Sequence, residues 1–391
     1  MKEAETIRLE MSEVKNSQGV SSPPLGAEGS TRVVIAGGGT GGHIFPAIAI
    51  ANAIKKINPS VEILFIGANG KMEMEKVPQA GYEIKGLTIA GFNRSSLIKN
   101  IGLPFKLIKS FWEVRNIFKA YQPTVVIGVG GYSTFPVLKY AQSQGIPTFI
   151  HESNSFAGKS NVLLGKNATK IFVATDGMEQ FFPKSKLLIT GNPVRSVIAD
   201  SSIKKEEAIT FFGLKQDKPT VLIVGGSLGA KSINEALVSS LKKIEKAGLQ
   251  LIWQTGKTNA DKYKQAANGN DSIWINEFIT RMEMAYAAAD VVISRSGAMA
   301  VTELCVVGKP SIFVPYPFAA EDHQTANAMA LVEKKAALLV KDSEVNDMLV
   351  ETLITLSTDE ALKSELKANI SALAITNADE VIAREILTLN P

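Results

Sequence analysis

Residues 32–43 read Arg-Val-Val-Ile-Ala-Gly-Gly-Gly-Thr-Gly-Gly-His, a short apolar run that ends in glycines. Apolar, mostly β-branched residues favour a buried strand, and glycines allow the sharp turn into the helix predicted over 44–57. Residues 220–227, Thr-Val-Leu-Ile-Val-Gly-Gly-Ser, repeat this pattern in the second half. The sequence therefore predicts two α/β units that begin alike.

The rest of each half alternates short apolar runs with amphipathic segments. In the first half we expect strands over 32–36, 61–66, 124–129, 147–150 and 170–174, and helices over 44–57, 106–120 and 135–144. In the second half we expect strands over 220–224, 249–254, 273–275, 291–294 and 311–314, and helices over 231–247, 282–289, 298–307 and 324–334. This alternation predicts parallel sheets with helices on both faces and ligands at the carboxyl ends of the strands.

Length and composition limit the organisation. The 391 residues suggest two domains, which we place at 31–199 and 200–369, with the helix over about 370–391 packing back on the first. Residues 1–30 are polar and are expected to form a disordered tail. The 42 Lys and Arg against 38 Asp and Glu give no reason to expect a nucleic-acid partner. A single cysteine, Cys305, excludes a disulfide framework.

The glycine loop before His43 is the first candidate site. Free N–H groups at a helix N-terminus attract phosphate, so the loop Gly37–Gly42 predicts a ligand-facing turn rather than only a structural one. His43 lies where the loop becomes helix. An imidazole titrates near neutrality and can accept a proton from an attacking hydroxyl, although a loop-bracing role would use the same residue.

Five further polar strings follow expected strands, and each could also be a capped turn or a solvated helix face. They are His151-Glu-Ser-Asn154, Gly191-Asn-Pro-Val-Arg195, Gly225-Gly-Ser-Leu-Gly-Ala230, Ser294-Arg-Ser-Gly-Ala-Met-Ala-Val-Thr-Glu303 and Glu321-Asp-His-Gln-Thr-Ala-Asn327. An Asn amide suits a sugar, a guanidinium can grip a diphosphate, and a carboxylate can accept from a ribose diol. No Asp-x-Asp pair or zinc pattern occurs, so we expect no metal and no other cofactor.

A basic stretch between Arg94 and Lys119 contains only one acid, Glu113. Apolar side chains ringed by lysines suit an anionic bilayer surface, whereas a core helix with a solvated basic face would show the same pattern. We expect the membrane patch to consist of Leu97, Ile98, Lys106, Leu107, Phe111 and Trp112.

Taken together, in order and spacing, these strings resemble the MurG family. They are Gly38-Gly-Thr-Gly-Gly-His43, Gly130-Gly-Tyr132, His151-Glu-Ser-Asn154, Gly191-Asn-Pro-Val-Arg195, Gly225-Gly-Ser227 and Ser296-Gly-Ala298. The resemblance implies a GT-B fold, in which two Rossmann-like domains with parallel sheets face each other across an interdomain cleft. It also implies an enzyme, an inverting N-acetylglucosaminyltransferase of peptidoglycan synthesis that converts lipid I to lipid II.

By this resemblance, the donor UDP-N-acetylglucosamine would meet a defined set of residues, and His43 would match the family's candidate catalytic histidine. The donor set is Thr40, Gly41, Gly42, Asn154, Arg195, Ser227, Ile279, Ala298, Met299, Ala300, Val301, Thr302, Glu303 and Gln324. Ile279 would bond the uracil through its backbone. The chain departs from the family at Ser153, where Gln is usual, and at Ala300, where a Thr hydroxyl is missing.

The resemblance further implies an acceptor and a location. The acceptor would be undecaprenyl-diphosphate-linked N-acetylmuramoyl pentapeptide, glycosylated at its C4 hydroxyl on the cytoplasmic face of the bacterial plasma membrane. The protein would bind peripherally to the anionic membrane surface there. Two alternatives remain at this stage: another GT-B enzyme, such as a diacylglycerol glycosyltransferase or a UDP-sugar epimerase, and a non-catalytic UDP-sugar-binding subunit.

Overall fold

The computed structural model describes residues 31–90, 102–199, 202–226 and 229–388. The predictions made for the tail over 1–30 and for Leu97, Ile98 and Ser227 lie outside the described residues.

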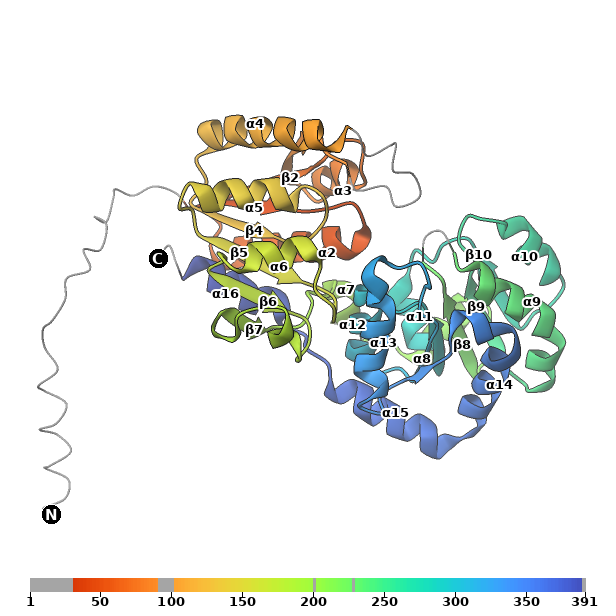
Figure 1. The fold of residues 1–391 in the computed structure, drawn as a ribbon. Coiled ribbons are helices and arrows are strands. Elements are labelled where there is room, and N and C mark those ends of the chain that lie inside the picture. The colour runs from red at the N-terminus through yellow and green to blue at the C-terminus, as the bar shows by residue number, and fades with distance from the viewer. Residues whose placement is uncertain (1–30, 91–101, 200–201, 227–228, 389–391) are drawn as a thin grey trace, which may run out of the picture. The chain divides into compact units, whose positions relative to one another are not determined.

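Seven parallel strands form the first sheet, in the order β3-β2-β1-β4-β5-β6-β7 (Figure 1). They are β1 (Arg32–Ala36), β2 (Glu62–Ala68), β3 (Glu83–Leu87), β4 (Val125–Gly128), β5 (Thr148–Glu152), β6 (Lys170–Val173) and β7 (Leu187–Ile189). Val33 and Ile35 of β1 face one hydrophobic core, and Val34 and Ala36 face another. Both faces are buried, which explains why β1 is apolar at every position after Arg32.

Helices cover both faces of this sheet. They are α2 (Gly41–Ile57), α3 (Glu73–Gln79), α4 (Leu103–Tyr121), α5 (Thr134–Ser143), α6 (Lys159–Gly165) and the short 3-10 turns η2 (Met178–Gln180) and η3 (Lys184–Lys186). The C-terminal helix α16 (Ala378–Leu387) also belongs to this layer, because Ile382, Ala383 and Ile386 share a core with Ile44 and Ile50 of α2.

The second sheet has six parallel strands in the order β10-β9-β8-β11-β12-β13. They are β8 (Thr220–Val224), β9 (Gln250–Gln254), β10 (Ile273–Asn276), β11 (Val291–Ser294), β12 (Ser311–Phe313) and β13 (Leu338–Leu339). Its helices are α7 (Ser196–Ala199), α8 (Lys205–Phe211), α9 (Lys231–Lys246), α10 (Ala260–Ala266), α11 (Met282–Ala288), α12 (Ala298–Val307), η4 (Ala320–Asp322), α13 (His323–Val332), η5 (Asp342–Glu344), α14 (Val345–Thr358) and α15 (Glu360–Ala372). The expected pair of parallel α/β sheets is therefore confirmed.

The order of both sheets reverses at the first strand of each. In the first sheet the chain moves outward from β1 to β3 and then returns to the other side at β4, and β8 and β11 occupy the same places in the second. Ligands of such sheets bind at this switch point, beyond the carboxyl ends of the two central strands. The loops after β1, β4, β8 and β11 are therefore where a site is expected.

The structure differs from the expected elements in several places: it contains elements that were not predicted, among them α3, β3, α6, β7, α8, α10, β13 and α14, and it extends β5. Strand β5 continues through Glu152, so His151 and Glu152 are buried strand residues rather than the start of the loop that follows. Helix α3 and strand β3 lie in a region, 67–105, where no element was predicted. Strand β3 pairs only with β2 at the edge of the sheet and carries Glu83 and Lys85, so it lacks the continuous apolar run of a central strand.

Candidate active site

A buried carboxylate holds the glycine loop between β1 and α2. Glu73 of α3 accepts hydrogen bonds from the Gly39 N–H at 2.7 Å and from the Ala68 N–H at 3.0 Å. The same loop is bound to the loop after β4, since the Gly38 N–H donates to the Gly130 carbonyl at 3.1 Å. Sequence reasoning missed Glu73, because its role depends on a contact 34 residues away.

His43 lies in the first turn of α2 and is half-buried. Its Nδ1 lies 3.1 Å from the Gly38 carbonyl oxygen, which can only accept, so Nδ1 carries the proton and Nε2 keeps its lone pair. No hydrogen bond joins Nε2 to another residue that the structure describes. Burial lowers the pKa of His43 below its ordinary 6.5, although the bond to Gly38 and the charge of Glu152 partly oppose this. The imidazole is therefore neutral at pH 7 and available as a base.

Gly130 makes room for the imidazole. Its φ is +96°, and a Cβ at this position would lie 2.7 Å from the Nε2 of His43. Only glycine accepts both this backbone conformation and this contact. The Gly130-Gly-Tyr132 string thus belongs to the same site as the first glycine loop, as the position of β4 beside β1 requires.

Glu152 organises the loop after β5. Its Oε1 accepts from the Asn154 N–H at 3.1 Å and from Asn154 Nδ2 at 3.3 Å, while Oε2 accepts from the Gly158 N–H at 3.1 Å and from Asn161 Nδ2 at 2.8 Å. These bonds orient the Asn154 side chain, whose Oδ1 accepts from Asn327 of α13 at 3.2 Å. Glu152 is therefore a positioning residue for Asn154.

His151 does not reach a cavity, although it belongs to the same string. It is fully buried, and its Nε2 lies 3.4 Å from the Gly191 carbonyl. Burial lowers the pKa of His151 to about 4, so the ring stays neutral over the physiological range. Its place in β5 makes it a core residue behind the site.

In the second unit, the loop after β11 is fixed by Arg295 and Ser296. Arg295 donates to the carbonyls of Val314 and Pro315 at 3.0 and 3.1 Å and pairs with Asp342 at 2.6 Å. The Ser296 hydroxyl donates to the Gln324 carbonyl at 2.8 Å. These contacts place Gly297 at the N-terminus of α12, whose first turn contains no acid. An anion at this helix start would meet free N–H groups without repulsion from a neighbouring carboxylate.

Gln254, at the end of β9, connects two of the expected donor segments. Its Nε2 donates to the Gly226 carbonyl at 3.0 Å, and its Oε1 accepts from the Ile279 N–H at 3.2 Å. Ile279 is buried in the loop before α11, where this bond occupies its N–H group. The sequence offered no signal for Gln254, because a lone Gln at a strand end has many other uses.

Arg195 and Glu303 are bonded to each other. The guanidinium Nε and Nη2 of Arg195 both donate to Glu303 Oε1, at 3.0 and 2.8 Å, and the Tyr286 hydroxyl donates to Oε2 at 3.0 Å. Burial of the Tyr286 phenol, together with the nearby charge of Glu303, which is itself buried, raises the pKa of Tyr286 well above 10. Arg195 also lies over the ring of Phe45, with its Cζ 5.9 Å from the centroid.

Two cavities meet at the start of α12. A cavity of about 440 Å³ lies over the glycine loop after β8 and includes Arg295 and Tyr316. A second cavity of about 580 Å³ contains His43 and Asn154. Both are lined by three shared residues, which are Gly297, Ala300 and Gln324.

The structure brings together only part of the expected donor set. Thr40, Gly42, His43, Asn154, Ala298, Met299, Ala300 and Gln324 line the cavity that contains His43. Val301 and Thr302 line a different cavity, and Gly41, Arg195, Ile279 and Glu303 line neither of the two that meet at α12. One turn of an α-helix takes 3.6 residues, so the consecutive residues 298–303 cannot all face the same side of α12. The cavity adds Lys71, which no expected string contains, and His323, which lies in the expected string 321–327 but outside the expected donor set.

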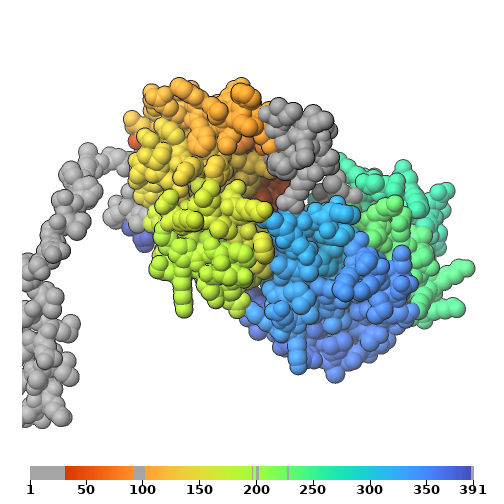
Figure 2. Space-filling view, in the orientation of Figure 1, coloured from red at the N-terminus to blue at the C-terminus, as the bar shows by residue number. Residues whose placement is uncertain are grey.

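The proposed membrane patch is displayed by α4. Phe105, Ile108 and Trp112 are 74%, 58% and 59% exposed, whereas Leu107 and Phe111 are half-buried. Glu113 points back to Thr88 and accepts from its N–H at 2.7 Å. Figure 2 shows α4, in orange, forming one end of the first unit.

In the part of the chain that the structure describes, no helix combines the length and apolarity needed to cross a membrane, and no cluster of three His, Cys, Asp or Glu side chains could hold a metal ion.

Comparison with known proteins gives matches over both units. The glycosyltransferase family 28 N-terminal domain matches residues 33–173, and the family 28 C-terminal domain matches residues 220–385. The chain is 51% identical over 366 residues to the UDP-N-acetylglucosamine–N-acetylmuramyl-(pentapeptide) pyrophosphoryl-undecaprenol N-acetylglucosamine transferase of Phocaeicola vulgatus, covering 93% of this chain and 97% of that protein. It is 49% identical to the transferase of the same name from Christiangramia forsetii, with 91% and 96% covered.

Solved structures agree with this assignment. A crystal structure of MurG from Acinetobacter baumannii superposes with a TM-score of 0.76 at 30% identity, covering 92% of this chain and 99% of that one. A UDP-N-acetylglucosamine 2-epimerase superposes with a TM-score of 0.64 at 12% identity over 93% and 96% of the two chains, which shows a shared fold alone. The chain therefore belongs to glycosyltransferase family 28 and, within it, to the MurG family that its motifs indicate.

Proposed function

We propose that this enzyme transfers N-acetylglucosamine from UDP-N-acetylglucosamine to the C4 hydroxyl of undecaprenyl-diphosphate-linked N-acetylmuramoyl pentapeptide, which converts lipid I to lipid II with inversion at the anomeric carbon. The observation that carries the proposal is the meeting of two cavities at the start of α12, with His43 in one and the second glycine loop in the other. The names of the relatives supply the donor and acceptor.

The nucleotide would occupy the cavity over the second glycine loop, and the sugar would extend past Gly297 and Ala300 toward His43. The diphosphate would then lie at the N-terminus of α12, where N–H groups stabilise the negative charge that develops on UDP as it leaves. Gln324 bonds the Tyr316 N–H through Oε1, so its amide nitrogen is the group that can donate to the sugar. Asn154, fixed by Glu152, would hold the sugar from the first unit.

The acceptor hydroxyl would attack the anomeric carbon from the face opposite UDP. Its proton passes to Nε2 of His43, while the bond between the anomeric carbon and the phosphate oxygen breaks and UDP takes the electron pair. The bond between Nδ1 and the Gly38 carbonyl supports this assignment, because it fixes the tautomer that has a free lone pair on Nε2.

The test is transfer of labelled N-acetylglucosamine to a lipid I analogue by wild type, His43→Ala and His323→Ala, each with and without EDTA. General-base catalysis typically contributes about 10²- to 10⁴-fold, so we expect kcat of His43→Ala to fall by that factor. His323 lines the same cavity and serves as the matched control, for which we expect less than about tenfold loss. Near-wild-type turnover of His43→Ala would show that another group accepts the proton.

We further propose that the enzyme is peripheral to the cytoplasmic face of the plasma membrane and contacts it through the exposed face of α4. Phe105, Ile108 and Trp112 are spaced by about one helical turn and can enter the interface together. Lys106, Lys109, Arg115 and Lys119 lie on the same helix and would attract anionic headgroups. Because the Glu113 side chain points toward Thr88, the one acidic residue of α4 adds no negative charge to this face.

Vesicle co-sedimentation tests this surface. A Phe105→Ser/Ile108→Ser/Trp112→Ser variant should lose binding to vesicles with anionic phosphatidylglycerol and keep its transfer to a short-chain soluble acceptor. The control is Leu163→Ser, because Leu163 is 50% exposed on α6, outside α4. Equal binding of wild type and the triple variant would remove α4 from the membrane contact.

A further inference from the structure

One peptide group of the first glycine loop connects His43 to a buried carboxylate. The peptide between Gly38 and Gly39 supplies both the Gly38 carbonyl and the Gly39 N–H. The carbonyl accepts from His43 Nδ1 at 3.1 Å, and the N–H donates to Glu73 Oε2 at 2.7 Å. The C=O and N–H of a trans peptide point in opposite directions, so this one group reaches from the carboxylate to the imidazole.

Glu73 is held firmly for this contact. It is 1% exposed at the start of α3, and its Oε1 accepts from the Ala68 N–H at 3.0 Å. The side chain is packed against the backbone around it, because a Cβ on Gly38 would clash with its carboxyl carbon and a Cβ on Gly67 would lie 2.5 Å from its Cγ. Among the described residues no Lys, Arg or His forms an ion pair with Glu73, so its hydrogen bonds go to two backbone N–H groups.

The orientation of the peptide between Gly38 and Gly39 decides which nitrogen of His43 carries the proton. With the carbonyl toward the ring, Nδ1 is protonated and Nε2 has the lone pair. If this peptide rotated by half a turn, its N–H would face Nδ1, the proton would lie on Nε2, and Nε2 would no longer be a base. Glycines on both sides permit such a rotation, since neither carries a Cβ. Glu73 opposes it, because the rotation would turn the carbonyl oxygen toward a carboxylate oxygen.

We propose that Glu73 is a positioning residue for glycosyl transfer, which acts through the Gly38–Gly39 peptide and fixes His43 as the tautomer with a free lone pair on Nε2. The role rests on the proposed function, in which His43 accepts the proton of the acceptor hydroxyl. Glu73 also makes the Gly38 carbonyl a stronger acceptor, because hydrogen bonds in a chain polarise one another. The imidazolium that forms during transfer is stabilised through this chain, and its proton stays on His43.

The tautomer of His43 can be read directly from ¹⁵N NMR of histidine-labelled protein at pH 8, with the His43 signals identified by their loss in His43→Ala. Wild type should show Nδ1–H alone, and signals of Nε2–H should appear in Glu73→Gln, since an amide has one oxygen for two N–H groups and no charge. Glu75→Gln is the matched control, because it makes the same change on the same helix at an exposed carboxylate. Nε2–H in wild type, or an unchanged tautomer in Glu73→Gln, would overturn the proposal.

Kinetics separate this role from a merely structural one. Glu73 lines neither donor cavity, so Glu73→Gln should lower kcat at least about tenfold while KM for UDP-N-acetylglucosamine changes less than about threefold. The charge of Glu73 raises the pKa of His43, so its loss should move the acid limb of kcat to lower pH. Other titratable groups that act on His43 or share its cavity are Glu152, His323, Lys71 and Tyr132, and the variant leaves all four in place. A lower Tm with unchanged tautomer, kcat and acid limb would mean that Glu73 only stabilises the loop.

A measurement without a Glu73 variant keeps the test decisive if Glu73→Gln fails to fold. In glycine-labelled wild type, the Gly39 amide proton should shift as His43 is protonated, because one peptide joins the two hydrogen bonds. The same titration of His43→Ala should lack this shift, and a Gly39 amide that ignores His43 would overturn the link. The spectra need no glycosyl transfer, so they decide the tautomer even if another group proves to be the base.

Discussion

Replacing Glu152 by Gln should destabilise the first unit and weaken the sugar site. Each Glu152 oxygen accepts two hydrogen bonds, and an amide can present only one oxygen. Two donors would therefore lose their acceptor and face an NH₂ group. Hydrogen bonds to a charged group contribute about 1.5–3 kcal/mol each, so the change should cost about 3–6 kcal/mol. Domains of this size lose about 2–4 °C in Tm per kcal/mol, which predicts a fall of at least about 6 °C.

Differential scanning calorimetry measures this change, and Glu179→Gln is the control because Glu179 is exposed on η2. Asn154 loses its anchor in the Glu152→Gln variant, so KM for UDP-N-acetylglucosamine should rise at the same time. Asn154→Ala combined with Glu152→Gln completes a double-mutant cycle, in which the two effects on KM should be less than additive. A Glu152→Gln protein that melts within about 1 °C of wild type would refute the reasoning, because it would mean that the buried carboxylate contributes no net stabilisation.

Three further predictions concern His43, His151 and Glu303. Because burial lowers the pKa of His43, kcat should fall on the acid side with an apparent pKa below 6.5, and His323→Ala should keep this limb in a pH–rate profile. The pKa of His151 in the folded protein, about 4, lies below its value of about 6.5 in the unfolded chain. The free energy of unfolding should therefore be highest above pH 6.5 and fall by about 2 kcal/mol by pH 5. Thermal melts of His151→Gln should lack this loss. Glu303→Gln should lower Tm in calorimetry, because Glu303 is buried and its two oxygens accept hydrogen bonds from Arg195 and from Tyr286, and an unchanged Tm would contradict this structural role.

The two parallel sheets could be predicted because their strands are local apolar runs followed by glycines. Residues 32–36 and 220–224 have the same bounds in the structure as in the prediction. Strand β3 could not be predicted from its own residues, because Glu83 and Lys85 interrupt the apolar pattern and the strand is held by its pairing with β2. The end of β5 was misplaced for a related reason. His151 and Glu152 look like loop residues until Gly191 and Asn161 supply their partners.

The site shows the same division between local and distant information. The glycine loops and the helix starts after them follow from local sequence, and the switch-point rule places them together. Which side chains of α12 face the cavity that contains His43 depends on where each residue lies around the helix, and this separates Ala300 from Val301. Glu73 and Gln254 connect segments that are distant in the chain, so no motif containing them could be recognised in advance.

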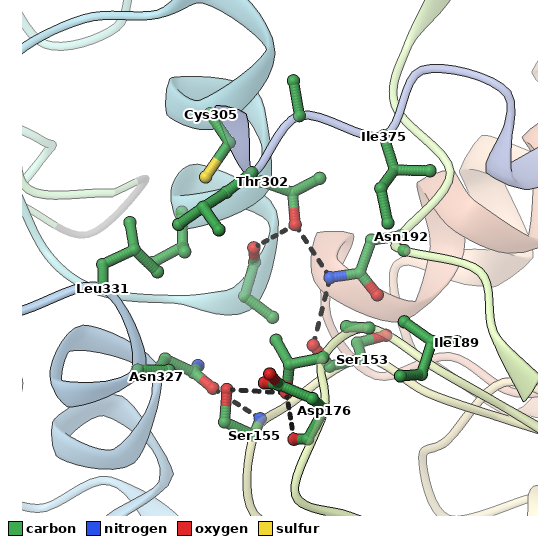
Figure 3. Close-up of a pocket in the computed structure, with 18 of the residues that line it drawn as sticks. Ser153, Ser155, Asp176, Ile189, Asn192, Thr302, Cys305, Asn327, Leu331 and Ile375 are labelled. Atoms are coloured by element: carbon green, nitrogen blue, oxygen red, sulfur yellow. Dashed lines mark hydrogen bonds between the residues drawn. The ribbon is translucent and has the colours of Figure 1, made fainter. Parts of the chain in front are cut away.

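Several hydrogen bonds join the two units beside the cavity that contains His43. Among the described residues, Asn192 bonds Thr302, Asn154 bonds Asn327, and the Ser155 N–H donates to Asn327 Oδ1 at 2.8 Å (Figure 3).

The cavity that contains His43 is also lined by Lys71 and Tyr132 from the first unit and by Ala320 and His323 from the second, and among these described residues no hydrogen bond or ion pair joins the two units. We therefore expect a movement of the units to pivot near the two segments in which the chain passes between them and to open the cavity between these four residues, where an acceptor that carries a long lipid would enter.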